Sequence, residues 1–149
     1  MRFYNDTHSK LMGYVLWLFG FTGAHRFYYA RPLTGTIWFF TFGLFGIGWL
    51  IDLFLIPSMD AQMDYQYKRG RIDYSLAWIL LTFLGVFGLH RLYLGEWLSG
   101  LFMLVVTLSL LASSLVLPFL SLLVLGVYIV LIYDFWTLNQ RINLINRQN

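Results

Sequence analysis

The chain has 149 residues, of which 59% are hydrophobic, 20% aromatic and 11% charged. A typical soluble domain is about 25% charged, so this composition predicts an integral membrane protein and argues against a disordered chain. The formal net charge of +3, spread along the chain, argues against a nucleic-acid partner, and a sequence with no cysteine excludes disulfides, zinc thiolates and a cysteine nucleophile.

Uncharged apolar runs define the predicted elements. In chain order they are Leu11–Ala24, Leu33–Ile51, Tyr74–Leu89 and Trp97–Tyr133. A spanning helix needs about 20 residues for a hydrocarbon core of ~30 Å. The second run has this length, whereas the first and third are short and must borrow from the loops after them or thin the bilayer.

The fourth run is too long for one span and slightly too short for two spans with a turn. Ser113, Ser114 and Pro118 lie in its middle, where a helix would kink or break. We therefore expect an all-α membrane protein made of two tandem transmembrane helical hairpins. It would have four spans, the last one long and broken near Ser113–Pro118, with five segments as the alternative.

An internal repeat supports this organisation. With an offset of 65 residues, Gly13–Gly35 aligns without a gap with Trp78–Gly100, and the identical pairs are Leu16/Leu81, Gly20/Gly85, Gly23/Gly88, His25/His90, Arg26/Arg91, Tyr28/Tyr93, Leu33/Leu98 and Gly35/Gly100. Near the ends of the copies Asp52 aligns with Asp134, at an offset of 82. The second copy therefore carries 17 extra residues, inserted where the first copy has Gly43, Gly46 and Gly48.

The repeat also bears on the N-terminal run. Lys10 precedes a short apolar stretch that ends in Thr22-Gly23-Ala24, as in a cleaved signal peptide, but the pattern recurs internally at Leu76–Gly88, so we expect a retained span. The predicted segments are an N-terminus (1–10), a first hairpin (11–56), a polar linker (57–75), a second hairpin (76–138) and a C-terminal tail (139–149).

The distribution of Lys and Arg predicts the orientation. With four spans, seven basic residues lie beside the termini and linker, and three, Arg26, Arg31 and Arg91, lie in the hairpin loops. Seven against three predicts a multi-pass protein of the cell (inner) membrane with both termini in the cytoplasm.

The two copies share an ordered motif. The first reads Gly20-Phe21-Thr22-Gly23-Ala24-His25-Arg26-Phe27-Tyr28, then Gly35, then Trp49-Leu50-Ile51-Asp52. The second reads Gly85-Val86-Phe87-Gly88-Leu89-His90-Arg91-Leu92-Tyr93-Leu94-Gly95, then Gly100 and Asp134. This pattern resembles the TM-two domain, a family of membrane proteins with two spans joined by a short loop. The chain departs from it at Tyr29-Ala30, Leu92 and Leu131, and in the 17-residue insertion.

The resemblance implies a bacterial-type inner-membrane protein of poorly defined role. It also implies that the arginine-bearing loop is cytoplasmic, as is often described for the family. The charge count above places that loop on the opposite side, and we keep the charge count as the prediction.

The loop motif of each copy is a histidine and an arginine followed by a tyrosine, namely His25, Arg26 and Tyr28, and His90, Arg91 and Tyr93. We expect these arginines to extend to lipid phosphates and so anchor the hairpins at the lipid headgroups. The functional alternative is a proton- or anion-binding loop, because histidine titrates near neutrality and arginine binds phosphate through two hydrogen bonds.

Asp52 and Asp134 are intramembrane or interfacial acids. Asp52 lies 17 residues past Gly35, about 25 Å along a helix, so in a plain hairpin it is across the membrane from Arg26 and an intrachain salt bridge between them is not expected. We favour headgroup-level aspartates bonded to neighbours, with candidates Lys10, Tyr14, Lys68 and Arg141. The alternative is a cation or proton relay where the hairpins meet.

Six glycines are predicted to pack helices closely: Gly20, Gly23, Gly35, Gly85, Gly88 and Gly100. In the two Gly-x-x-Gly pairs, residues i and i+3 would form a smooth patch on one helix face.

No catalytic constellation, metal-ligand spacing or cofactor motif is present in the sequence, so we predict neither an enzyme nor a cofactor. The expected partners are the lipid bilayer and, as a further possibility, other membrane proteins or a second copy. The predicted function is a structural or partner-binding membrane module. The alternative is a small ion or proton channel or transporter that uses the aspartates and the His-Arg loops.

Overall fold

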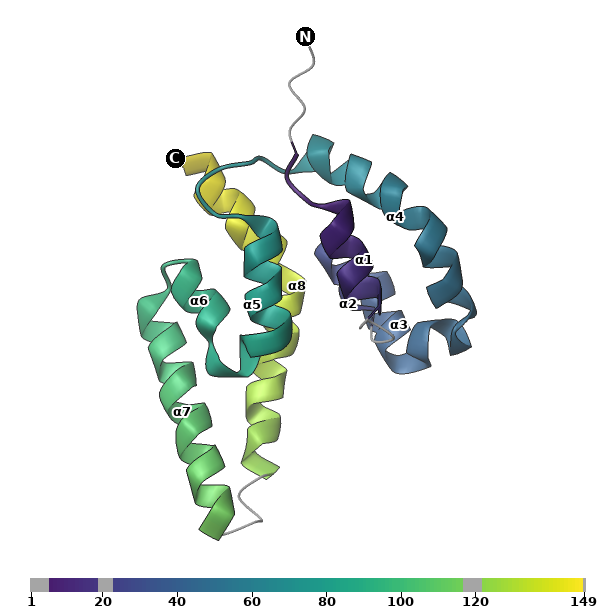
Figure 1. Ribbon diagram of the computed structural model, residues 1–149. Helices are drawn as coiled ribbons and strands as arrows, with labels where there is room; N and C mark the ends of the chain where they lie inside the picture. The colour runs from purple at the N-terminus through teal and green to yellow at the C-terminus, as the bar shows by residue number, and fades with distance from the viewer. Residues whose placement is uncertain (1–5, 19–22, 117–121, 149) are drawn as a thin grey trace. The chain divides into compact units, whose positions relative to one another are not determined.

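The computed structural model describes residues 6–18, 23–116 and 122–148 (Figure 1). All regular elements within these ranges are helices, in agreement with the predicted all-α class. The chain divides into two compact units, one formed by Met1–Ser75 with Asn139–Asn149 and the other by Leu76–Leu138. The predicted linker and tail thus belong to the first unit.

The first unit contains α1 (Lys10–Leu18), α2 (Ala24–Tyr28), α3 (Pro32–Phe45) and α4 (Ile47–Gln66), together with the last part of α8 (Val124–Gln148). Proline suits the first position of α3, where its missing N–H has no helical partner. Between α3 and α4 the chain turns sharply at Phe42–Gly46, where every residue has a positive φ. We call this segment the first tip.

By the end of α2 the chain has returned to the end of the unit where α1 begins. The Ser9 amide donates a hydrogen bond to the Tyr28 hydroxyl at 2.7 Å, and a Cβ added to Gly13 would lie 2.0 Å from the Tyr29 hydroxyl. In a straight helix, Ser9 and Tyr28 would be about 28 Å apart. The predicted plain hairpin is therefore wrong for Leu11–Ala24, because α1 and α2 form a short re-entrant pair.

The run Leu33–Ile51 is not a single span either. It is divided between α3 and α4, which pack against each other. At the far end of α1, Trp17 stacks on Trp49 with ring centroids 4.3 Å apart. Each indole N–H also donates to the main-chain oxygen of the other tryptophan. The turn that divides this run coincides with Gly43 and Gly46, where the sequence already predicts bending.

The second unit repeats this path with a longer hairpin. It contains α5 (Tyr74–Leu84) from Leu76 onward, the 3-10 helix η1 (Gly85–Phe87), α6 (Leu89–Tyr93), α7 (Trp97–Val116) and α8 up to Leu138. The Thr107 hydroxyl donates to the Val86 oxygen at 2.6 Å, so η1 lies about 15 Å along α7 from Trp97. The segment α5–η1–α6 enters beside the middle of α7 and turns back (Figure 1).

Only α7, among the described helices, is long and apolar enough to cross a membrane by length and composition. The prediction of four spans is therefore not confirmed. The run Trp97–Tyr133 is shared by α7 and α8, with Ser113 and Ser114 inside α7. The predicted break at Pro118 and the predicted packing residue Gly20 lie outside the described residues.

Candidate functional site: two buried His–Arg–Asp clusters

The first cluster joins α2 to α4. The Arg26 Nε donates to Asp52 Oδ2 at 2.8 Å, and Arg26 Nη2 donates to Asp52 Oδ1. The His25 Nε2 lies 2.7 Å from the same Oδ2. The guanidinium also lies over the Trp38 ring, 3.6 Å from its centroid. His25 and Asp52 are fully buried, so this ion pair is closed off from solvent.

The second cluster has the same geometry in the second unit. The Arg91 Nε and Nη2 donate to Asp134 Oδ2 and Oδ1 at 2.9 and 2.7 Å. The His90 Nε2 lies 2.9 Å from Asp134 Oδ2. His90 and Asp134 are fully buried. The cluster is therefore a shared feature of both copies of the repeat.

Local backbone geometry explains why histidine and arginine reach one carboxylate. α2 and α6 are single-turn helices of five residues, and each follows a glycine with a left-handed φ, Gly23 at 73° and Gly88 at 71°. Left-handed backbone is readily adopted by glycine, which lacks a Cβ. The turn aims the short helix back along the unit, so its His-Arg pair faces the aspartate of the returning helix.

These contacts correct three predictions. Arg26 is 6% exposed and bound to Asp52, so its guanidinium does not extend to lipid phosphates. The Arg26–Asp52 salt bridge, which a plain hairpin excludes, is present. The re-entrant pair and the turn at the first tip bring the two residues to the same level of the unit. The aspartates are therefore buried ion-pair partners, whereas the sequence favours headgroup-level acids.

The glycines also differ from their predicted arrangement. Gly23 and Gly88 have a positive φ and precede helices, and Gly88 does not form a helix face with Gly85. A Cβ on Gly23 would lie 2.8 Å from the Gly35 oxygen, and one on Gly88 would lie 2.9 Å from the Gly100 oxygen. The glycine pairs thus allow two backbones to approach between α2 and α3 and between α6 and α7.

The remaining glycines meet side chains. A Cβ on Gly35 would lie 2.8 Å from the Phe27 ring, one on Gly100 would lie 2.6 Å from Leu92 Cδ2, and one on Gly85 would lie 2.9 Å from Leu131 Cδ2.

Comparison with known proteins identifies the family of the chain. The TM2 domain family model matches residues 6–54 and 71–136, which together make up more than half of the chain. The chain belongs to the TM2 domain family. The two matched segments fall on the two copies of the repeat, and the family suggests a membrane protein.

Three relatives are TM2 domain-containing proteins of Dictyostelium discoideum. They are 51% identical over 60 residues, 49% over 47 residues and 48% over 52 residues, which cover 40%, 31% and 34% of this chain. The chain spans 39%, 34% and 32% of the length of these relatives. They are eukaryotic, so the bacterial type implied by the resemblance is not supported. No solved structure matches the chain.

The first TM2 unit also has a polar end that the sequence did not single out. The His8 ring packs against Tyr28 and Tyr74, with centroids 4.8 and 4.5 Å away. The Thr7 amide donates to Asp64 at 3.0 Å. The Asn139 amide donates to the Tyr28 oxygen at 2.8 Å. The N-terminus, the loop after α2, the end of α4 and the last part of α8 therefore meet at one end of this unit.

Two titratable groups of this polar end have shifted pKa values. Burial lowers the pKa of His8 from 6.5 to about 3. Burial raises the pKa of Asp60, which lies beyond the apolar part of α4, to about 6, with a further contribution from Asp64. The fold therefore keeps His8 neutral and favours a protonated Asp60 in mildly acidic solution.

This pair predicts opposite pH dependences in two TM2 variants. In Asp60→Asn, only the unfolded chain binds a proton on His8 between pH 6.5 and 3. The free energy of unfolding therefore decreases as the pH is lowered, by about 2 kcal/mol at pH 5. In His8→Asn, the folded chain retains the Asp60 proton more strongly, so stability rises as pH falls through about 6. Thermal unfolding in detergent at several pH values tests both, and parallel profiles would contradict the assignment.

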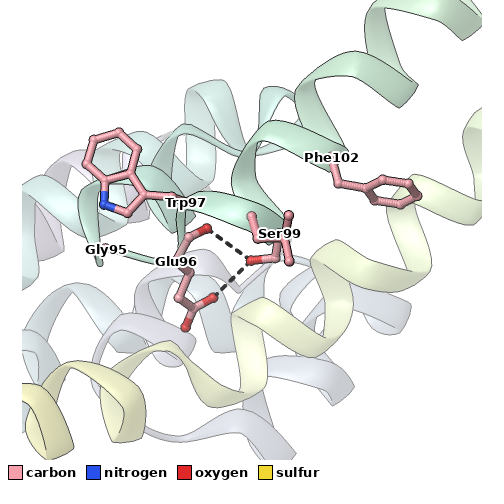
Figure 2. A pocket seen from close by; sticks show the side chains of 6 residues that line it. Gly95, Glu96, Trp97, Ser99 and Phe102 are labelled. Atoms are coloured by element: carbon pink, nitrogen blue, oxygen red, sulfur yellow. Dashed lines mark hydrogen bonds between the residues drawn. The ribbon is translucent and has the colours of Figure 1, made fainter.

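An open surface depression lies at the start of α7 in the second TM2 unit (Figure 2). It is lined by Gly95, Glu96, Trp97, Leu98, Ser99 and Phe102. The Ser99 hydroxyl donates to the main-chain oxygen of Glu96 at 3.2 Å. Glu96 is the one titratable side chain in this lining, so the depression has no acid–base pair. The described residues also contain no cluster of three or more metal-ligating side chains.

Proposed function

We propose that this TM2 protein is a multi-pass protein of the cell membrane that acts as a structural or partner-binding module and not as an enzyme. The observation that carries the proposal is that the buried charges of each unit are paired with one another. Each aspartate uses both oxygens on one arginine and one histidine. Buried polar groups that satisfy one another hold a fold together, whereas a conduit needs a row of accessible ones.

The outer helix faces support the membrane location. Side chains that point away from the units include Leu98, Leu115 and Phe102 on α7, which are 87%, 86% and 70% exposed. Large apolar patches of this kind mark contact with lipid or with another protein.

The basic residues support a revised orientation. The predicted hairpins divide the Lys and Arg seven to three. With re-entrant pairs, the loop after α2 lies at the end of the first unit that also holds the N-terminus and linker, and Arg31 Nη2 donates to Gln62 on α4 at 2.6 Å. The hairpin segments that follow these loops, residues 32–51 and 97–133, contain no Lys or Arg. The positive-inside rule then assigns the end of each unit that carries its Lys and Arg to the cytoplasm.

Single-cysteine labelling tests the orientation, and the chain offers a cysteine-free background. We expect Glu96→Cys, in the loop before α7, and Tyr65→Cys, near the end of α4, to react with a membrane-impermeant maleimide from the same side of sealed vesicles. A plain hairpin gives reaction from opposite sides. Labelling in detergent controls for intrinsic reactivity.

A proton conduit is the second candidate, because the Nδ1 atoms of His25 and His90 are buried and have no hydrogen-bond partner among the described residues. Proton flux into liposomes that carry the purified protein distinguishes the two. The module predicts flux equal to that of empty liposomes and recovery of membrane-protein partners after mild detergent extraction. Flux that is lost in His25→Gln and His90→Gln variants that still fold contradicts it.

A further inference from the structure

The hairpin formed by α3 and α4 in the first unit is shorter than the bilayer core is thick. From Arg31, held by Gln62, the straight part of α3 runs from Pro32 to Thr41 before the first tip, ten residues or about 15 Å. On α4, Asp52 is buried against Arg26, so the largely apolar stretch that starts at Ile47 runs to Met59, 13 residues or about 20 Å. A bilayer core is ~30 Å thick. A hairpin of this length ends before the far headgroups.

The first tip is chemically suited to hydrocarbon. Phe45 is 90% exposed and Phe42 is 67% exposed. Residues 32–51 contain no charged side chain. A tip at the far aqueous surface gains nothing from such aromatic exposure, whereas a tip within the acyl chains buries it.

The backbone of the first tip is also internally bonded. The Leu44 amide donates to the Thr41 hydroxyl at 3.1 Å, and that hydroxyl donates to the Ile37 oxygen at 2.7 Å. The Gly46 amide donates to the Phe42 oxygen at 3.1 Å. Unpaired backbone groups are costly in lipid, so irregular backbone there must satisfy its hydrogen bonds within the protein. Thr41 is a polar side chain that meets this need without exposing a free donor.

The second copy shows what a crossing hairpin requires. It carries 17 extra residues, and those that lie in α7 make that helix longer than α3. The helix α7 reaches 20 residues, about 30 Å. The insertion therefore accounts for the difference between a hairpin that crosses the bilayer core and one that does not.

We propose that the first unit is a half-inserted hairpin whose tip, Phe42–Gly46, ends among the acyl chains near the middle of the bilayer, so that its partner is lipid hydrocarbon. This inference rests on the membrane location under the proposed function. The unit adds most of its volume to the cytoplasmic leaflet, while the second unit crosses both leaflets.

Three single-cysteine variants in sealed vesicles of phosphatidylcholine and phosphatidylglycerol test the proposal. Tyr65→Cys reports the cytoplasmic side, Leu115→Cys the end of α7, and Phe45→Cys the first tip; all three positions are at least 85% exposed. With an impermeant maleimide, we expect Tyr65→Cys and Leu115→Cys to react from opposite sides. Phe45→Cys should react from neither side until detergent is added.

The outcomes separate this inference from the proposed function. Reaction of Phe45→Cys from the Leu115→Cys side overturns the half-inserted hairpin and leaves the crossing second unit intact. Reaction of Tyr65→Cys and Leu115→Cys from one side overturns the multi-pass assignment. A nitroxide attached at Phe45→Cys gives a second measurement. It should collide with oxygen but be protected from a water-soluble nickel complex. Oxidative cross-linking of Phe45→Cys into dimers would contradict the proposal, because it would show that the first tip contacts a second copy of the chain and not lipid.

Discussion

Asp52→Asn should lower the free energy of unfolding in detergent by about 3–5 kcal/mol, because it leaves the buried Arg26 guanidinium without its counter-charge. Asp52 is fully buried and both of its oxygens accept bonds from Arg26. Asp134→Asn should have a comparable effect in the second unit, where the geometry is the same. Thermal unfolding followed by circular dichroism measures both.

A double variant separates the loss of charge balance from the loss of packing. In Arg26→Met with Asp52→Asn, no charge is buried, and the amide oxygen of the introduced asparagine can still accept a bond from the His25 ring. We expect this double variant to be clearly more stable than Asp52→Asn alone, since replacing both partners of a buried ion pair is often neutral. Equal stability of wild type and Asp52→Asn would show that the ion pair contributes nothing to the fold.

Gly88→Ala should be the most damaging glycine substitution in the second unit. The new Cβ would lie 2.9 Å from the Gly100 oxygen and 3.0 Å from Met103 Cβ, and the residue would keep a φ of 71°. A left-handed φ alone costs a non-glycine residue about 1–3 kcal/mol, and displacement of the α7 backbone adds to it. We expect loss of folded protein in size-exclusion chromatography and a lower unfolding temperature.

Two other glycines provide matched controls for this substitution. Gly95 has a φ of 86° but open space around a Cβ, so Gly95→Ala measures the backbone strain alone. Gly126 lies in α8 with open space and an ordinary φ, so Gly126→Ala should stabilise the helix by about 1 kcal/mol. If Gly88→Ala and Gly95→Ala lowered the unfolding temperature equally, the close approach of α6 to α7 would contribute nothing to stability.

The helical class and the repeat could be predicted from sequence, because apolar runs and aligned residues need no tertiary information. The residues of both clusters could also be predicted as special, since His-Arg and Asp recur in register. Their pairing could not be predicted, because it depends on where the chain turns. The one indication was that Leu11–Ala24 and Tyr74–Leu89 are shorter than a span, a length better suited to re-entrant pairs than to helices extended into their loops.

The first tip shows a second limit of sequence reasoning. Gly43 and Gly46 predict bending, but Phe42, Leu44 and Phe45 also adopt positive φ. Bulky residues rarely occupy that region, so their types argue against the turn that the fold imposes. His8 was missed for a related reason, because its tyrosine neighbours come from α2, the linker and the start of α5 and have no sequence spacing in common.

The last part of α8 sets the order in which the first unit can be completed during synthesis. Asn139 donates to the main chain at Phe27 and Tyr28, and Asn146 pairs with both backbone groups of Ile72. These asparagines are translated only after the whole second unit. A ribosome that has finished α1 to α4 has therefore made a half that still lacks its closing segment. Until α8 emerges, the backbone groups of Phe27, Tyr28 and Ile72 lack these hydrogen-bond partners.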